Sequence, residues 1–98
     1  MLRFKVCGGI EELAGVSVNV FPNPNSGIFT LELRTLKQEK LDVLIVSPLG
    51  ETVYTRHGLE VSGIATEKID VSRLSQGTYL LQVSNDSGKM TRKIVIQK

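Results

Sequence analysis

Residues 28–34 have the sequence Ile-Phe-Thr-Leu-Glu-Leu-Arg, in which apolar and polar side chains alternate. In an extended chain, Phe29, Leu31 and Leu33 lie on one face and the polar residues between them lie on the other. This period of two predicts a β-strand with one face in a core and one in water. Residues 78–85 repeat the pattern, so we expect strands rather than helices to build the protein.

Short β-branched or alternating segments recur on both sides of this stretch, separated by turn signals. Their spacing of about 8 to 12 residues is typical of a β-sandwich. We therefore predict an all-β fold, an Ig-like antiparallel β-sandwich of about seven strands with at most one helical turn. The strands are expected at residues 17–21, 28–34, 40–47, 52–57, 64–71, 78–85 and 89–97.

The turns between these strands have sequences that explain them. In Phe-Pro-Asn-Pro-Asn-Ser-Gly, residues 21–27, each proline removes a backbone donor and keeps the preceding residue extended, which ends the first strand. Gly27 allows the positive φ at which the chain re-enters a strand. Ser-Pro-Leu-Gly at 47–50 and Asn-Asp-Ser-Gly at 85–88 are short links, which predict antiparallel neighbours.

A further corner is formed by Leu-Ser-Gln-Gly-Thr-Tyr, residues 74–79. A tyrosine just inside a strand after such a turn is typical of the tyrosine corner of Ig-like sandwiches, in which its hydroxyl donates to upstream backbone. We expect Tyr79 to be buried in one core with Phe29 and Leu81.

The predicted strand at 40–47 is apolar on both faces in its second half, where Leu-Asp-Val-Leu-Ile-Val occupies residues 41–46. Such a pattern is typical of a central strand or of a strand covered by a partner. Leu44 and Val46 are therefore candidates for an exposed apolar face. A homodimer through that face or through a sheet edge is one predicted association.

Length and charge narrow the class of protein. A chain of 98 residues suits one domain with one core. Its 12 Lys and Arg against 10 Asp and Glu leave a net charge of +2, and no aromatic residues are interleaved with a basic stripe, so nucleic-acid binding is not expected. No apolar run approaches the roughly 20 residues that span a bilayer, so no membrane insertion is expected.

Residues 1–16 do not join the strand pattern clearly. We interpret them as the tail of an upstream domain and a linker, with the sandwich domain at residues 17–98 and the chain as a fragment of a longer protein. Cys7 is the only cysteine, which excludes an internal disulfide, and it is interpreted as a linker residue. Because this stretch lacks the apolar segment of a signal peptide, any export signal is expected upstream.

The groups that catalysis needs are missing from the sequence. It has one His and one Cys, and no spacing is typical of a zinc site, a phosphate-binding glycine loop or a nucleophile elbow. His57 is interpreted as a solvated turn residue, because it stands beside Gly58 at the end of a predicted strand. We therefore expect no enzyme activity, no catalytic residue, no metal and no cofactor.

Several motifs together are more specific than any one of them. Val-Asn-Val-Phe-Pro-Asn-Pro at 18–24 is followed by Gly27, by the strand at 41–46, and by the block Ile-Asp-Val-Ser-Arg-Leu-Ser-Gln-Gly-Thr-Tyr at 69–79. Lys-Ile-Val-Ile-Gln-Lys at 93–98 completes the series. In this order the motifs resemble the C-terminal sorting domain of the type IX secretion system. The residues that carry the resemblance are Pro22, Asn23, Pro24, Gly27, Gly50, Leu74, Gly77 and Tyr79.

The resemblance covers residues 18–98 and implies a seven-stranded Ig-like sandwich carried behind a cargo protein, in a family found in Bacteroidetes. It implies that the cargo passes through the periplasm and is secreted or displayed on the cell surface. The implied partners are the outer-membrane translocon, a shuttle protein and a sortase-like peptidase that cuts between Cys7 and Val16. Recognition is expected at the last strand, through Lys93, Ile94, Val95, Ile96 and Lys98.

A second function is open from the sequence, a spacer or adhesion module of the fibronectin-like or carbohydrate-binding kind. The strand at 93–98 favours the sorting signal, because a spacer has no need to end a protein. A strand at a sheet edge offers its backbone to another chain by β-augmentation, with the lysines supplying charge. In the simpler interpretation, Ile94 and Ile96 fill the core and the lysines protect the edge, and the two roles are compatible.

Overall fold

The computed structural model describes residues 15–98, which form seven strands and no helix. The predicted all-β class is therefore confirmed, and each predicted strand is present. The strands are β1 (Val16–Phe21), β2 (Ile28–Thr35), β3 (Glu39–Val46), β4 (Thr52–Val61), β5 (Ile64–Asp70), β6 (Gly77–Asn85) and β7 (Gly88–Ile96).

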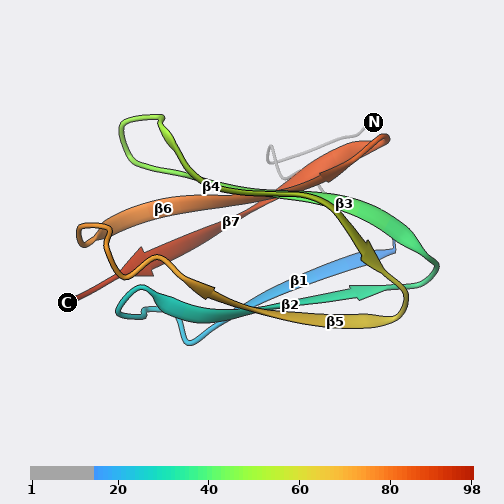
Figure 1. Ribbon diagram of the computed structural model, residues 1–98, viewed down its shortest axis with the longest axis horizontal. Helices are drawn as coiled ribbons and strands as arrows, with labels where there is room; N and C mark the ends of the chain where they lie inside the picture. Colours follow the sequence, from blue (N-terminus) through green and yellow to red (C-terminus); the bar gives the residue numbers. More distant parts are fainter. Residues whose placement is uncertain (1–14) are drawn as a thin grey trace, which may run out of the picture.

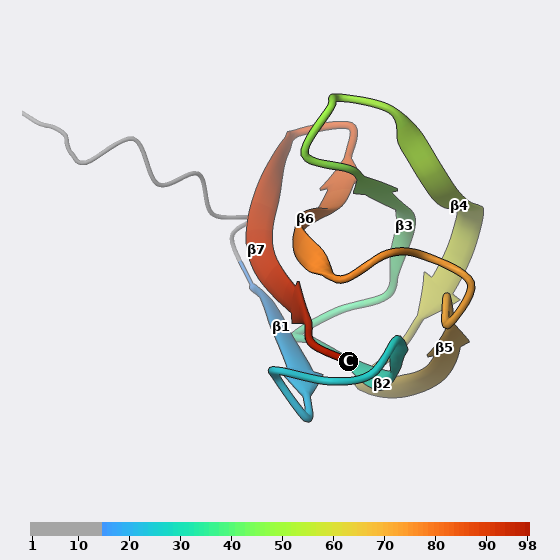
Figure 2. The same ribbon diagram turned by 90° about the vertical axis from the view of Figure 1, so that its left-hand side faces the viewer.

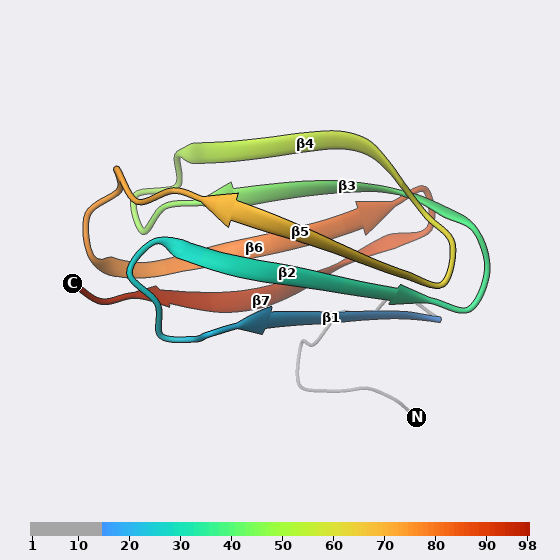
Figure 3. The same cartoon turned by 60° about the horizontal axis from the view of Figure 1, so that its bottom comes forward.

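The strands form two sheets that face each other, as the end-on view in Figure 2 shows. One sheet has three strands in the order β1-β2-β5, and the other has four in the order β4-β3-β6-β7. Every neighbouring pair is antiparallel. The links β2 to β3, β4 to β5 and β5 to β6 cross between the sheets, whereas the other consecutive strands pair directly (Figures 1 and 3). This arrangement is the predicted antiparallel sandwich.

The core lies between the sheets and is built from the inward positions of both. Phe29, Leu31 and Leu33 of β2 are 2%, 1% and 0% exposed, as their alternation predicts. Tyr79 and Leu81 of β6 belong to the same buried cluster as Phe29, which confirms the expected common core. Burial of each such side chain contributes about 1.5–3 kcal/mol, so this alternation is the main source of the fold's stability.

Strand β4 is longer than the sequence predicts. The turn signal at Gly58 was expected to end a strand at residue 57, but β4 continues to Val61. Gly58 has a φ of 66°, and the register with β3 shifts beside it, so the glycine forms a bulge within the strand. Beyond the bulge, Leu59 and Val61 return to the core. His57 is exposed, as predicted, but it lies inside β4 rather than in a turn.

Strand β1 begins one residue earlier than the sequence predicts. Val16 is the first residue of β1, pairs with Thr35 of β2 and is only 9% exposed. Cys7 and most of the predicted linker lie outside the described residues. Among residues 15–98, no helix has the length and apolarity needed to cross a bilayer.

Candidate recognition site

The residues that carry the family resemblance gather at one end of the sandwich. Three loops meet there, the β1–β2 loop at 22–27, the β3–β4 loop at 47–51 and the β5–β6 loop at 71–76, together with the last residues of β7 (left in Figure 1). We call this group of loops, with the end of β7 and Lys98, the motif end. The motif residues that it brings together are Pro22, Asn23, Pro24, Gly27, Gly50, Leu74, Gly77 and Tyr79.

Gly27 is where two of these loops touch. Its carbonyl accepts a hydrogen bond of 2.7 Å from the backbone N–H of Val71. A Cβ at this position would lie 2.6 Å from the Cα of Ser72, and the φ of Gly27 is 110°. Both the contact and the backbone conformation exclude a side chain, so glycine permits the β1–β2 loop to pack on the β5–β6 loop.

Asn23 connects the same loop to the last strand. Its side-chain Nδ2 donates to the carbonyl of Lys93 at 3.0 Å, and its Oδ1 accepts from the backbone N–H of Val95 at 2.9 Å. A side-chain amide has the donor and acceptor of a peptide group, so Asn23 pairs with β7 as a neighbouring strand does.

Asn25 extends this pairing through its own backbone. Its N–H donates to the carbonyl of Val95 at 2.9 Å, and its carbonyl accepts from the N–H of Gln97 at 2.7 Å. The Asn25 side chain is 6% exposed and stabilises the loop itself, since it donates to the Pro22 carbonyl and accepts from the N–H of Gly27. Together Asn23 and Asn25 form what we call the asparagine clip.

The asparagine clip changes the expectation for β7. The strand lies at a sheet edge, as β-augmentation requires. However, the edge-facing backbone groups from the Lys93 carbonyl to the Gln97 N–H are already paired with the β1–β2 loop. Another strand therefore has to displace the clip before it pairs with this part of β7. The sequence predicts a turn at residues 21–27 but does not indicate that this turn pairs with β7.

The β5–β6 loop contains the predicted tyrosine corner. The hydroxyl of Tyr79 donates to the carbonyl of Ser75 at 2.8 Å, and the side chain is 5% exposed. Lys98 reaches the same loop, since its Nζ donates to the Ser72 carbonyl and its N–H donates to Oε1 of Gln76 at 3.4 Å. The end of the chain is thus attached to two of the motif loops.

Asp70 closes the start of the β5–β6 loop. Its Oδ1 accepts from the N–H of Ser72 at 3.0 Å and from the Ser72 hydroxyl at 2.7 Å. These two bonds, with the hydroxyl bond as the larger cause, hold the pKa of the Asp70 carboxyl below its ordinary value. The carboxylate therefore has a structural role in shaping the loop.

The five residues expected to recognise a partner are divided between two environments. Ile94 and Ile96 are 0% and 2% exposed and belong to the core. Lys93 and Lys98 are exposed, and Val95 is half-buried. Only Lys93, Val95 and Lys98 present their side chains to the outside of the folded domain.

A shallow cavity of about 370 Å³ lies at the motif end, between the β3–β4 and β5–β6 loops. Arg73 lines this cavity and donates to the carbonyl of Val53 at 2.9 Å. The apolar lining of the cavity consists of Pro48, Leu49, Val53, Leu74 and Tyr79. Within residues 15–98, no cluster of three or more His, Cys, Asp or Glu side chains is arranged to hold a metal ion.

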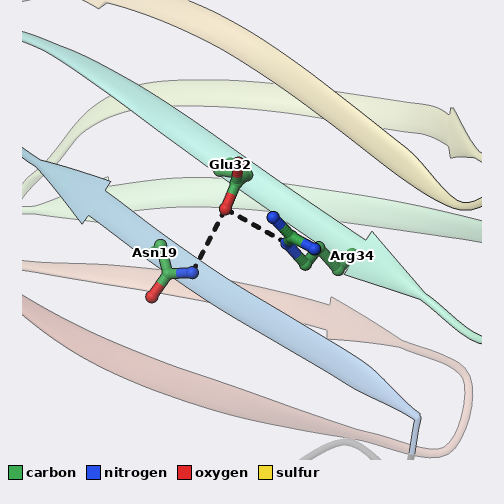
Figure 4. Close-up of polar contacts among 3 residues, drawn as sticks. All are labelled: Asn19, Glu32 and Arg34. Carbon is green, nitrogen blue, oxygen red and sulfur yellow. Dashed lines mark hydrogen bonds and ion pairs between the residues drawn. The ribbon is translucent and has the colours of Figure 1, made fainter.

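A polar network that the sequence did not indicate lies on the outer face of the three-stranded sheet (Figure 4). Oε1 of Glu32 accepts from Nδ2 of Asn19 at 3.2 Å and from Nε of Arg34 at 3.3 Å. The Asn19 bond, followed by the Arg34 bond, lowers the pKa of Glu32. Asn19 and Glu32 are opposite each other in the β1–β2 register, so the network supports strand pairing.

Comparison with known proteins agrees with the arrangement of these motifs. The family model described as "Secretion system C-terminal sorting domain" matches residues 19–97, which include the asparagine clip, the tyrosine corner and all of β7. No curated protein matches the chain. Members of this family are sorting signals rather than catalysts, and the proteins that carry them are exported and are secreted or surface-associated. The chain therefore belongs to the family of secretion system C-terminal sorting domains, the signals that are recognised by the type IX secretion machinery.

Proposed function

We propose that the type IX machinery reads this domain in its folded form, at the motif end and at the outward side chains of β7. In this proposal the domain and its cargo reach the periplasm, where the outer-membrane translocon and a shuttle protein bind the domain. A sortase-like peptidase then removes it. The observation that carries the proposal is the convergence of motif residues from four separate parts of the chain at one end of the sandwich.

Exposed apolar side chains support the motif end as a binding surface. Phe21, Ile28 and Leu49 are 46%, 40% and 87% exposed, and all three lie in or beside the motif loops. Water leaves exposed apolar side chains when a partner binds, so these three residues supply apolar area to such a surface.

The charge of β7 and of Lys98, which follows it, supports the same assignment. Lys89, Lys93 and Lys98 are exposed, and no carboxylate of the described residues is within ion-pair distance of any of them. Surface cations that lack an ion-pair partner attract an acidic partner and speed its association. The outward face of the last strand is therefore suited to an acidic surface.

Removal of the domain is proposed to occur before β1. Of the interval from Cys7 to Val16, only Gly15 and Val16 are described. Val16 is buried and paired within the sheet, so a protease has no access to the bond after it in the folded domain. A cut on the N-terminal side of Val16 leaves the sandwich whole.

The test is export of a periplasmic reporter fused in front of residues 15–98, in a bacterium with a working type IX system. We expect the reporter at the surface or in the medium, and we expect it in the periplasm when the domain is deleted. Retention of the intact fusion in the periplasm of a competent strain would contradict the proposal, as would its equal export from a strain without the translocon.

A double charge reversal tests whether Lys93 and Lys98 are needed for export. Lys93→Glu with Lys98→Glu is expected to lower export, because it reverses the exposed charge of β7 and leaves Ile94 and Ile96 in the core. The matched control is the pair Lys37→Glu and Lys68→Glu, two exposed lysines away from the end of β7, with the same change in net charge. Lys93→Glu is also tested alone, because Lys98 contacts the β5–β6 loop. Equal export of the two double variants would contradict the assignment of recognition to the end of β7.

A further inference from the structure

The outer face of the four-stranded sheet carries a group of apolar side chains next to the motif end. Leu80 of β6 is 44% exposed and is opposite Val46 of β3 on one side and Lys93 of β7 on the other. Leu44 and Val95, which also point outward, are half-buried beside this row. We call Leu44, Val46, Leu80 and Val95, with Lys93, the outer row.

This surface contains the outward residues of two features that the sequence singled out separately. Leu44 and Val46 are the outward residues of the strand that is apolar on both faces, and Lys93 and Val95 are the outward residues of the expected recognition strand. The register places both pairs around Leu80, which the sequence analysis did not single out. Side chains from three adjacent strands thus form one surface.

The asparagine clip decides how β7 is able to meet a partner. Because the backbone edge from the Lys93 carbonyl to the Gln97 N–H is already paired, an added strand has no free hydrogen-bonding groups between those two atoms. The side chains on the outer face of β7 have no such obstacle. Contact through the face therefore needs no rearrangement of the folded domain.

We propose that the outer row is the docking surface for a protein of the secretion machinery that presents apolar side chains beside a carboxylate. This inference rests on the proposed function and specifies the surface and the chemistry of the partner. The apolar residues supply the area that loses water on binding, and Lys93, which has no acidic neighbour among the described residues, pairs with the carboxylate.

A second copy of this chain fits the outer row less well than an acidic partner. Asp42 is the one carboxylate on the outward positions of β3, β6 and β7, and its Oδ1 already accepts from the N–H of Gly58 at 2.9 Å. The same oxygen lies 3.7 Å from Nδ1 of His57. Two copies face to face would bring their Lys93 and Lys89 side chains into one interface with little negative charge to balance them.

The reporter fusion tests the outer row with Leu80→Glu, which places a negative charge in the middle of the apolar surface. The matched control is Ile64→Glu, because Ile64 is an exposed apolar residue of the other sheet, 59% exposed. We expect Leu80→Glu to reduce export by about tenfold or more, the effect of losing one central contact, and Ile64→Glu to leave it unchanged. Lys93→Arg should keep export and Lys93→Glu should reduce it, because only the second removes the positive charge.

Folding and self-association are measured on the purified domain. The melting temperature of each variant shows whether it folds. If Leu80→Glu lowers stability, Leu80→Thr repeats the export measurement with a residue that favours strands. Export of folded Leu80→Glu and Leu80→Thr at the level of the unchanged domain would overturn the inference. Sedimentation of the unchanged domain as a dimer that Leu80→Glu dissociates would also overturn it, by assigning the face to a second copy. Retention of the unchanged fusion would instead contradict the proposed function.

Discussion

The side chain of Asn23 should be a major source of stability for the last strand, and Asn23→Ala tests this. The substitution removes the hydrogen bonds to the Lys93 carbonyl and to the Val95 N–H, while the rest of the loop remains. Each bond contributes about 1 kcal/mol net, so we expect the free energy of unfolding to fall by about 2 kcal/mol. For a domain of this size, that loss lowers the melting temperature by about 8 to 16 °C.

Amide hydrogen exchange locates the effect. The Val95 N–H should exchange faster in Asn23→Ala, because its only acceptor from the β1–β2 loop is the lost Oδ1. Core amides that pair β3 with β6 should change only as far as global stability changes. Asn23→Asp should also destabilise, since it keeps the acceptor but sets a carboxylate oxygen against the Lys93 carbonyl.

The control is Asn19→Ala on the neighbouring strand. Asn19 donates one exposed side-chain hydrogen bond, to Glu32, and belongs to β1, which pairs with β2 rather than with β7, so its loss should change the melting temperature much less. An unchanged melting temperature in Asn23→Ala, together with unchanged exchange at Val95, would refute the assignment of Asn23 as part of the clip.

Substitutions at four further positions test other parts of the structure. Gly27→Ala should lower the free energy of unfolding by more than the roughly 1–3 kcal/mol typical of an unfavourable φ, because its Cβ also meets the backbone of Ser72. Gly50→Ala has no atom near its Cβ, so it should lose only the amount due to the unfavourable φ. Urea unfolding measures both. Tyr79→Phe should cost about 1 kcal/mol for the corner hydrogen bond, and Tyr79→Ala about 3 kcal/mol or more for the lost core packing; equal costs would contradict the corner. Glu32 has a folded-state pKa below its ordinary value of 4.5, so its contribution to stability is present above that pH and is lost as the pH falls through the lowered pKa. Melting temperatures measured between about pH 5 and pH 3 should therefore fall less steeply in Glu32→Gln, and an identical slope would contradict the network with Asn19.

The family match decides between the two functions that the sequence left open. The match over residues 19–97 assigns the chain to sorting domains, and not to spacers or carbohydrate-binding modules. The motifs were informative before the structure was known because each one has a local cause, such as a proline that ends a strand or a glycine that allows a positive φ. The order of the motifs then distinguished this family from other sandwiches.

Local patterns in the sequence were sufficient for the strands and for their buried faces. The alternation in β2 and β6 assigned Phe29, Leu31 and Tyr79 to the core, because the side of a strand on which a residue lies depends only on its neighbours in the chain. The same rule separates Ile94 from Lys93. The prediction that a strand ends beside Gly58 was wrong, because a turn and a bulge use the same positive φ. Only the pairing with β3 distinguishes the two.

The candidate site depended on tertiary structure. Asn23 bonds to Lys93 and Val95, which lie 70 and 72 positions further along the chain. The outer row joins side chains from three strands. No local period records which loop closes the edge of β7 or which outward residues become neighbours. These contacts follow from the strand order within the four-stranded sheet and from how the two sheets pack, and both minimise the free energy of the whole domain rather than of any one segment.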